Sequence, residues 1–249
     1  MRPPPGVVVS PPPPRQPLSR ERVLEAAIRV ADRGGVEAIT MRRVAQELGV
    51  EAMSLYNHVP NKDAILDGVV DMVFAAIEPP DADRDDWRDA IRARASSARA
   101  VLSRHSWALG FMDSRRNPGP ATLRHHDAVL GVLREAGFTL PMAVHAVSLI
   151  DSYVGGFVLQ EANLPVARPD DVEEVAGGIL KDLPADELPY LTEVIVHHAL
   201  RPGYDHTSEF GYGLDLILDA LEARRSQGSG GRADGVSAPR GSGGGRPSS

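Results

Sequence analysis

The sequence predicts an all-α fold, with an N-terminal three-helix domain that contains a helix-turn-helix and a larger helical C-terminal domain. Apolar residues recur at helical spacing through most of the chain, and no segment shows the period-two alternation of a β-strand. Hydrophobic residues make up 42% of the chain but aromatic residues only 5%, which favours helices packed on helices. With 249 residues, the chain is long enough to bury a substantial core.

Composition also excludes several kinds of site. The chain has no cysteine, which rules out disulfides, thiolate metal ligands and cysteine nucleophiles. It shows no targeting segment and no uninterrupted apolar run of the length that spans a membrane. We therefore expect a soluble cytoplasmic protein with no membrane partner.

The two ends of the chain are expected to be disordered. Residues 1–17 form a proline-rich arm, and residues 226–249 form a tail of Gly, Ser and Arg with almost nothing to bury. Between them we predict a first helical domain over residues 18–64 and a second over residues 65–225.

The first helix is expected to start at Ser19, a residue type that caps helices, and to stop at Gly34–Gly35. Leu18 and Val23 flank the cap as a hydrophobic staple. The apolar face of this helix consists of Val23, Leu24, Ala27, Ile28 and Ala31.

The next segment has the spacing of a helix-turn-helix. Thr40 can cap a helix over residues 41–48, and Gly49 can adopt the left-handed conformation that ends it. Ala45 is small where the next helix must approach closely, and Leu55 faces inward to hold the two helices together.

The remaining helices follow in order, several of them separated by prolines or glycines. They are expected over residues 52–58, 62–77, 86–104, 106–113, 119–136, 140–162, 170–181, 186–200 and 208–225.

Charge is unevenly distributed along the chain. Residues 1–62 contain nine Lys and Arg against six Asp and Glu, although the whole chain has a net charge of −7. A basic N-terminal segment in an otherwise acidic chain suits local contact with phosphate groups. Since a B-DNA major groove admits one α-helix, the helix around residues 52–58 is the candidate for entering it.

The residues expected to contact DNA differ in chemistry. Tyr56, His58 and Lys62 suit phosphate oxygens, which position a protein without specifying sequence. Asn57 can reach a base edge or a phosphate, and Met53 offers an apolar contact, for instance with a thymine methyl. The complete set is Thr40, Arg42, Ala52, Met53, Ser54, Tyr56, Asn57, His58 and Lys62. The alternative is that they are ordinary side chains of a surface helix.

The stretch from Ile39 to Val50, followed by Leu55–Tyr56, His58–Val59 and Asn61–Lys62, closely resembles the N-terminal domain of TetR-family transcriptional repressors. The ending LY-x-HV-x-NK is similar to the tetracycline repressor subgroup in particular. The resemblance extends through residues 133–138, 143–159 and 210–218 of the C-terminal part.

This resemblance implies a homodimer without enzymatic activity. Each N-terminal domain would bind half of a palindromic operator in double-stranded DNA, and a small-molecule effector in the C-terminal domain would release it. The chain has Ala52–Met53–Ser54 where the tetracycline repressor has Gln-Pro-Thr, and Asn57 where it has Trp. We therefore expect a different operator sequence.

The effector is expected to differ from magnesium-bound tetracycline. The positions that hold the metal and the drug in the subgroup fall on Phe111, Glu78 and Arg94, and none of the three matches. Candidate pocket residues, which would line a mostly apolar cavity, are Trp107, Phe111, Met142, His145, Ser148, Ser152 and Tyr153. Their alternative role is in the core or at an interface.

No cofactor or metal is expected. Adjacent helical residues such as His125–His126 point about 100° apart and cannot chelate one ion as a pair.

Two helices are expected to form the dimer interface. Apolar residues at helical spacing along them are Val147, Ile150, Val154, Phe157, Phe210, Leu214, Ile217 and Leu221. Two such helices from each subunit would form a four-helix bundle, with Gly155–Gly156 permitting close approach. The alternative is that both helices pack within one subunit.

Two other functions stay open at this point. One is a DNA-binding regulator that responds to no small molecule. The other is a helical enzyme, which would need a convergent acid–base set. Asp151, His145 and Glu161 are instead spread over different helix faces.

Overall fold

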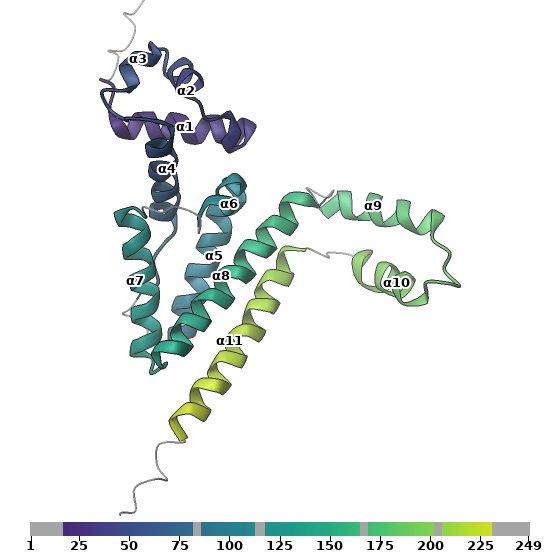
Figure 1. Ribbon diagram of the computed structural model, residues 1–249. Helices are drawn as coiled ribbons and strands as arrows, with labels where there is room; N and C mark the ends of the chain where they lie inside the picture. The colour runs from purple at the N-terminus through teal and green to yellow at the C-terminus, as the bar shows by residue number, and fades with distance from the viewer. Residues whose placement is uncertain (1–16, 82–85, 113–117, 165–168, 202–205, 231–249) are drawn as a thin grey trace, which may run out of the picture. The chain divides into compact units, whose positions relative to one another are not determined.

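Every regular element that the structure describes is helical, which confirms the all-α prediction for those residues (Figure 1). The structure is a computed structural model and describes residues 17–81, 86–112, 118–164, 169–201 and 206–230. The predicted N-terminal arm lies outside these ranges except for Pro17, and so does the predicted tail beyond Gly230.

The chain divides into two compact units. Unit 1 combines Met1–Ala76 with Trp107–Leu123, and unit 2 combines Ile77–Ser106 with Arg124–Ser249. The boundary that we predicted after residue 64 falls inside a helix of unit 1.

The first helix of unit 1, α1 (Arg20–Gly34), is capped as its sequence predicts. The Ser19 side chain accepts a hydrogen bond from the Arg22 amide at 3.3 Å. Gly35, with φ of 72°, adopts the left-handed region that favours glycine and ends the helix. A 3₁₀ turn, η1 (Val36–Ala38), then leads to the next helix.

Helices α2 (Met41–Leu48) and α3 (Ala52–Leu55) form the predicted helix-turn-helix. Thr40 accepts a hydrogen bond from the Arg43 amide at 3.2 Å, and Gly49 ends α2 with φ of 67°. The two helices pack on α1 through a core that contains Ala45 and Leu55, together with Val23, Leu24, Val44 and Val59.

Helix α3 is shorter than predicted, because residues 56–58 form turns. The amides of Tyr56 and His58 each bond the carbonyl three residues earlier, on Met53 and Leu55. Such i−3 bonds tighten the chain beyond an α-helix, and Pro60 disfavours a helical conformation of the residue before it.

Helix α4 (Lys62–Ala76) follows, with the Asn61 side chain capping it at the Ala64 amide, 2.8 Å away. Unit 1 also contains η2 (Ser106–Ala108) from Trp107 onward, α6 (Leu109–Met112) and the first residues of α7 (Pro120–Glu135). Asp71 on α4 accepts hydrogen bonds from the amide and hydroxyl of Thr122, at 2.8 and 3.1 Å. Gly119 permits this contact, because a Cβ there would lie 2.2 Å from the Asp71 carboxyl carbon.

Unit 2 contains the longest of the described helices together with shorter elements. They are α5 (Trp87–Arg104), most of α7, α8 (Leu140–Asn163), α9 (Pro169–Asp182), α10 (Pro189–Val194), a π-helical turn η3 (Ile195–Ala199) and α11 (Thr207–Gly230). Helix α8 packs against both α5 and α11. The helix predicted over residues 186–200 begins later, at Pro189, and changes to π geometry at Ile195. The last helix runs five residues past its predicted end at Arg225.

Helix α8 is unusually apolar. By length and composition it could cross a membrane, with a mean hydropathy of 1.5 over its most apolar window, which differs from our expectation that no segment could. Its buried residues pack in the core of unit 2, as core helices of soluble proteins also do. Only 33% of that window is buried within the single chain.

Candidate nucleic-acid interface

The residues predicted to contact DNA all lie on unit 1, between the start of α2 and the start of α4. Leu55 is completely buried, whereas its neighbours Met53 and Tyr56 are 75% and 49% exposed. Thr40, Arg42 and Asn57 are exposed, and the other four candidates are partly exposed. A buried anchor on a short helix therefore presents the remaining side chains to solvent.

The beginning of α2 offers groups suited to phosphate. The Thr40 oxygen accepts the bond that caps the helix, and its hydroxyl hydrogen remains able to donate. Arg42, in the first turn, forms no ion pair with any residue that the structure describes. A helix N-terminus and an available guanidinium are both favourable next to an anion.

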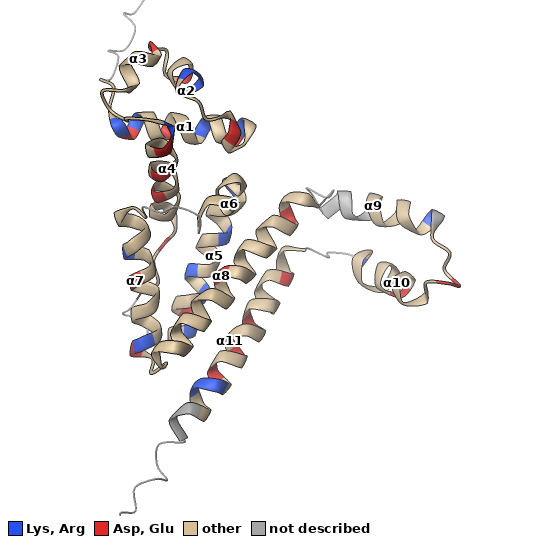
Figure 2. Cartoon of the chain, in the orientation of Figure 1, with Lys and Arg blue, Asp and Glu red and all other residues tan. Residues whose placement is uncertain are grey.

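At the C-terminal end of α2, the negative charge of Glu47 is neutralised by ion pairs with α1. Glu47 pairs with Arg29, 3.0 Å away, and with Arg33, both from α1. The hydrogen bonds from Arg29 and then Arg33 lower the pKa of the Glu47 carboxyl, so it stays ionised. Figure 2 shows Lys and Arg on both α1 and α2, with Asp and Glu along α4.

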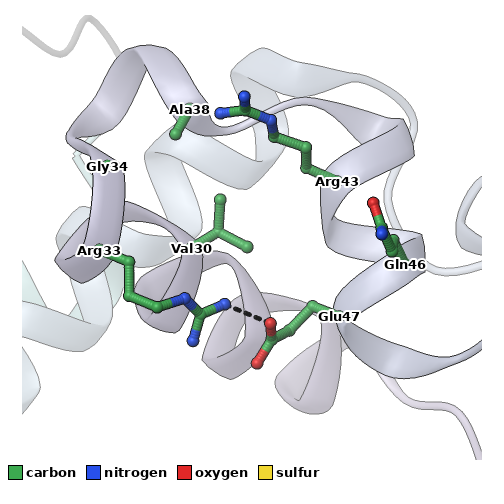
Figure 3. Close-up of a pocket in the computed structure, with 7 residues that line it drawn as sticks. All are labelled: Val30, Arg33, Gly34, Ala38, Arg43, Gln46 and Glu47. Atoms are coloured by element: carbon green, nitrogen blue, oxygen red, sulfur yellow. Dashed lines mark hydrogen bonds and ion pairs between the residues drawn. The ribbon is translucent and has the colours of Figure 1, made fainter.

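A groove of about 530 Å³ lies between α1 and α2 (Figure 3). Its lining residues are Val30, Arg33, Gly34, Ala38, Arg43, Gln46 and Glu47. None of the nine predicted DNA-contacting residues lines it. We therefore interpret the groove as a feature of the packing of α2 on α1 and not as part of the DNA-contacting surface.

The predicted effector-pocket residues are divided between the two units. Trp107 and Phe111 belong to unit 1, and the other five are on α8 in unit 2. Trp107 packs against the core of the helix-turn-helix and donates a hydrogen bond to Asp32 on α1. On α8, Met142 and Tyr153 are partly buried, whereas His145, Ser148 and Ser152 are exposed.

The contacts of Tyr153 are with α11. Its hydroxyl donates to the carbonyls of Glu209 and Phe210, at 3.2 and 3.0 Å, and its ring stacks on Phe210. Burial raises the pKa of the Tyr153 hydroxyl, so the group stays protonated and remains a donor. Gly213 makes room for it, because a Cβ there would lie 2.3 Å from the hydroxyl oxygen.

Most of the predicted dimer residues face the interior of the single chain. Six of the eight are buried, and Val147 and Ile217 are partly buried. The reason is that α8 and α11 pack against each other, and α8 also packs against α5, so these apolar positions are already covered. Large apolar side chains of the same helices that remain exposed are Leu140, Val144, Leu149, Leu159, Tyr212 and Leu216.

Unit 2 contains a buried polar cluster that the sequence analysis did not predict. Arg94 on α5 is 4% exposed, donates from Nε to His125 Nε2 at 3.0 Å, and pairs through Nη1 with Asp151 on α8. Burial, followed by the charge of Arg94, lowers the pKa of His125 to about 4, so this histidine is neutral at pH 7. The sequence did carry a signal, because Arg94 continues the apolar stripe of Trp87, Ile91 and Ala98 at helical spacing.

The two acidic residues considered for an acid–base set are engaged in ion pairs with arginines. Asp151 pairs with Arg94, and Glu161 pairs with Arg99. Among the described residues, no three His, Cys, Asp or Glu side chains are grouped in a way that could hold a metal ion.

Comparison with protein families gives two matches, which together cover most of the chain. Residues 23–69 match the model for bacterial regulatory proteins of the tetR family. Residues 79–225 match the model for the tetracyclin repressor-like C-terminal domain.

Characterised relatives are similar over most of their length. The chain is 35% identical to the transcriptional repressor DrrR1 of Streptomyces coeruleorubidus, over 86% of this chain and 81% of that protein. It is 32% identical to the class A tetracycline repressor from transposon 1721 in Escherichia coli, over 84% and 92% of the two chains.

Solved structures show the same fold. Apo ActR from Streptomyces coelicolor superposes with a TM-score of 0.69 at 27% identity, over 86% of this chain and 99% of that one. ActR in complex with actinorhodin superposes with a TM-score of 0.68 at 28% identity, over 83% and 96%.

Proposed function

The chain belongs to the TetR family of bacterial transcriptional regulators, and we propose that it is a dimeric repressor that leaves a palindromic operator when a small-molecule effector binds. Members of this family are transcription factors rather than enzymes. We further propose that the protein acts in the cytoplasm, in agreement with the regulatory roles of its bacterial relatives.

The observation that carries the DNA-binding assignment is the exposure pattern around Leu55. An anchor that is completely buried lies between Met53 and Tyr56, whose exposed side chains are therefore available to contact DNA. Thr40 and Arg42 add an N-terminal helix turn and a cation suited to phosphate. We assign DNA contact to all nine predicted residues, and we take residues 18–64 as the DNA-binding domain.

A dimer is supported by the apolar surface of α8 and α11. Leu149, Ser152, Gly156 and Leu159 follow helical spacing on the exposed side of α8, and Tyr212 and Leu216 do so on α11. Large apolar side chains that remain exposed on two adjacent helices are typical of an oligomer interface. We therefore place the dimer contact on these outward positions rather than on the buried ones.

The proposed effector site is in unit 2. Small-molecule sites combine apolar walls with a few oriented polar groups, and such groups are supplied by the buried Arg94 and His125 together with the partly exposed Asp151. Met142 and Tyr153 are partly buried on the same unit and remain candidates for the wall. ActR, which shares the fold, has been solved with actinorhodin, so that compound is a suitable first probe.

Footprinting the protein on the DNA upstream of its own gene tests the operator assignment. We expect protection of an inverted repeat, and protection that disappears when a matching effector is added. If no small molecule in a broad screen, including actinorhodin, weakens the footprint, the regulator acts without a small-molecule effector. If no duplex is protected, the repressor assignment is wrong.

A further inference from the structure

Met53 is the most exposed large apolar side chain on α1 to α4. Its exposed fraction is 75%, although Leu55, two residues later, is completely buried. A thioether side chain gains about 25 cal/mol for each Å² of apolar surface removed from water. The structure buries Leu55 in the core and leaves the apolar surface of Met53 in solvent, where it is available to a partner.

The segment from α2 to α4 that contains Met53 also presents groups suited to phosphate. Arg42 and Tyr56 are exposed and Lys62 is partly exposed, so groups suited to phosphate accompany the apolar side chain. The residues on either side, Ala52 and Ser54, offer a methyl group and one hydroxyl. The beginning of α3 therefore holds no amide or guanidinium that could form a bidentate bond with a purine.

Only one of the four DNA bases presents an apolar group in the major groove. Thymine carries a 5-methyl group there, whereas guanine, cytosine and adenine present hydrogen-bonding groups at their exposed edges. We propose that Met53 determines operator sequence by packing against a thymine 5-methyl in each half-site. This inference rests on the proposed DNA-binding function and adds the chemical group that is read.

The contribution of the methyl group can be measured apart from every other property of the base. Deoxyuridine pairs with adenine and offers the same hydrogen-bonding groups as thymidine, but it lacks the methyl. Burial of one methyl-sized group corresponds to about a fourfold change in an equilibrium constant. Replacing the contacted thymine by uracil should therefore weaken wild-type binding about fourfold, and more if both half-sites are changed.

The test begins with operators selected from a random pool of duplexes by the full-length protein. Each thymine of the selected operator is then replaced in turn by deoxyuridine, and binding is measured by fluorescence anisotropy. The proteins compared are wild type, Met53→Ala, Met53→Leu and Tyr56→Ala. Met53→Ala should fold normally, because the side chain is exposed, and its thermal unfolding is recorded alongside.

We expect at least one thymine whose replacement weakens binding of wild type and Met53→Leu but leaves Met53→Ala unaffected. Such coupling between the two deletions assigns the contact to this pair of groups. At that position 5-methylcytosine, which carries the same methyl, should be preferred over cytosine by wild type and Met53→Leu but not by Met53→Ala.

Two results would overturn the proposal while leaving the repressor assignment intact. One is selection of a specific operator in which no thymine distinguishes wild type from Met53→Ala. The other is coupling of the methyl group to Tyr56 with none to Met53. Failure to select any operator would instead contradict the proposed function itself.

Discussion

The indole Nε1 of Trp107 donates a 2.8 Å hydrogen bond to the carboxylate of Asp32, near the end of α1. Trp107 also packs against the core formed by α1 to α4. The segment that follows α5 is therefore attached to the helix-turn-helix through a residue that we had predicted to line the effector pocket. Its indole N–H already has an acceptor, so any contact with an effector would have to use the ring face.

We expect Trp107→Phe to lower the free energy of unfolding by about 1 kcal/mol, since it removes one hydrogen bond but keeps most of the apolar ring. Asp32→Asn should have a smaller effect, because its amide oxygen can still accept from the indole. Urea denaturation of the two variants measures the difference. Equal stability of Trp107→Phe and wild type would show that the bond contributes nothing.

Gly213 and Gly211 on α11 provide a matched pair. A Cβ at residue 213 would lie 2.3 Å from the Tyr153 hydroxyl, whereas nothing lies within 4 Å of one at residue 211. We expect Gly213→Ala to destabilise the protein by about 1–3 kcal/mol through overpacking. Gly211→Ala should instead be neutral or slightly stabilising, since alanine is the better helix former. Thermal unfolding compares them, and an equal effect of both changes would contradict the close crossing of α8 and α11.

Much of unit 1 could be predicted from its sequence because local rules dominate there. Ser19, Thr40 and Gly49 cap or end helices through contacts within a few residues, and all three do so where predicted. The apolar spacing of Leu55 likewise predicted its burial.

The remaining differences arise from contacts between distant segments. Helical spacing shows that Ile150 and Leu214 lie on apolar faces, but it cannot show whether those faces meet within one chain or across a dimer. Trp107 and Arg94 have partners 75 and 31 residues away, so no local pattern identifies those partners. The short α3 has a local cause instead, because residues 56–58 form turns ahead of Pro60, and sequence patterns do not fix the exact end of a helix.

His125 should make stability depend on pH. Its pKa is about 4 in the folded chain against 6.5 in an ordinary environment, because burial disfavours the imidazolium. Between these values the unfolded chain binds one more proton, so stability falls as the pH drops from 6.5 to 4 and is fully present above 6.5. The expected contribution is about 3 kcal/mol.

Denaturation at several pH values tests this dependence. His125→Gln, which cannot titrate, should flatten the profile between pH 4 and 6.5. His145→Gln changes an exposed histidine on α8 and keeps His125, so it should retain the slope. An unchanged slope in His125→Gln would mean that other groups cause the acid sensitivity.

The proposed dimer surface predicts an asymmetry between two exposed leucines. Leu216→Arg places a charge on the outward side of α11, where the side chain is 53% exposed, and should convert the dimer to monomer. Leu123→Arg, on the similarly exposed surface of α7, should remain dimeric. Light scattering after gel filtration gives the masses. A dimer that survives Leu216→Arg would move the interface away from this face.

The most direct test of the proposed DNA-binding surface is the operator affinity of Tyr56→Ala compared with that of Tyr190→Ala. Both tyrosines are exposed, Tyr56 just after α3 and Tyr190 on α10, and both variants should keep the fold. Anisotropy titrations against the footprinted upstream DNA, repeated at several salt concentrations, give the affinities. We predict that Tyr56→Ala weakens binding at least tenfold, or about 1.4 kcal/mol, and that Tyr190→Ala binds like wild type. Equal affinities for Tyr56→Ala and wild type would contradict the DNA-binding surface.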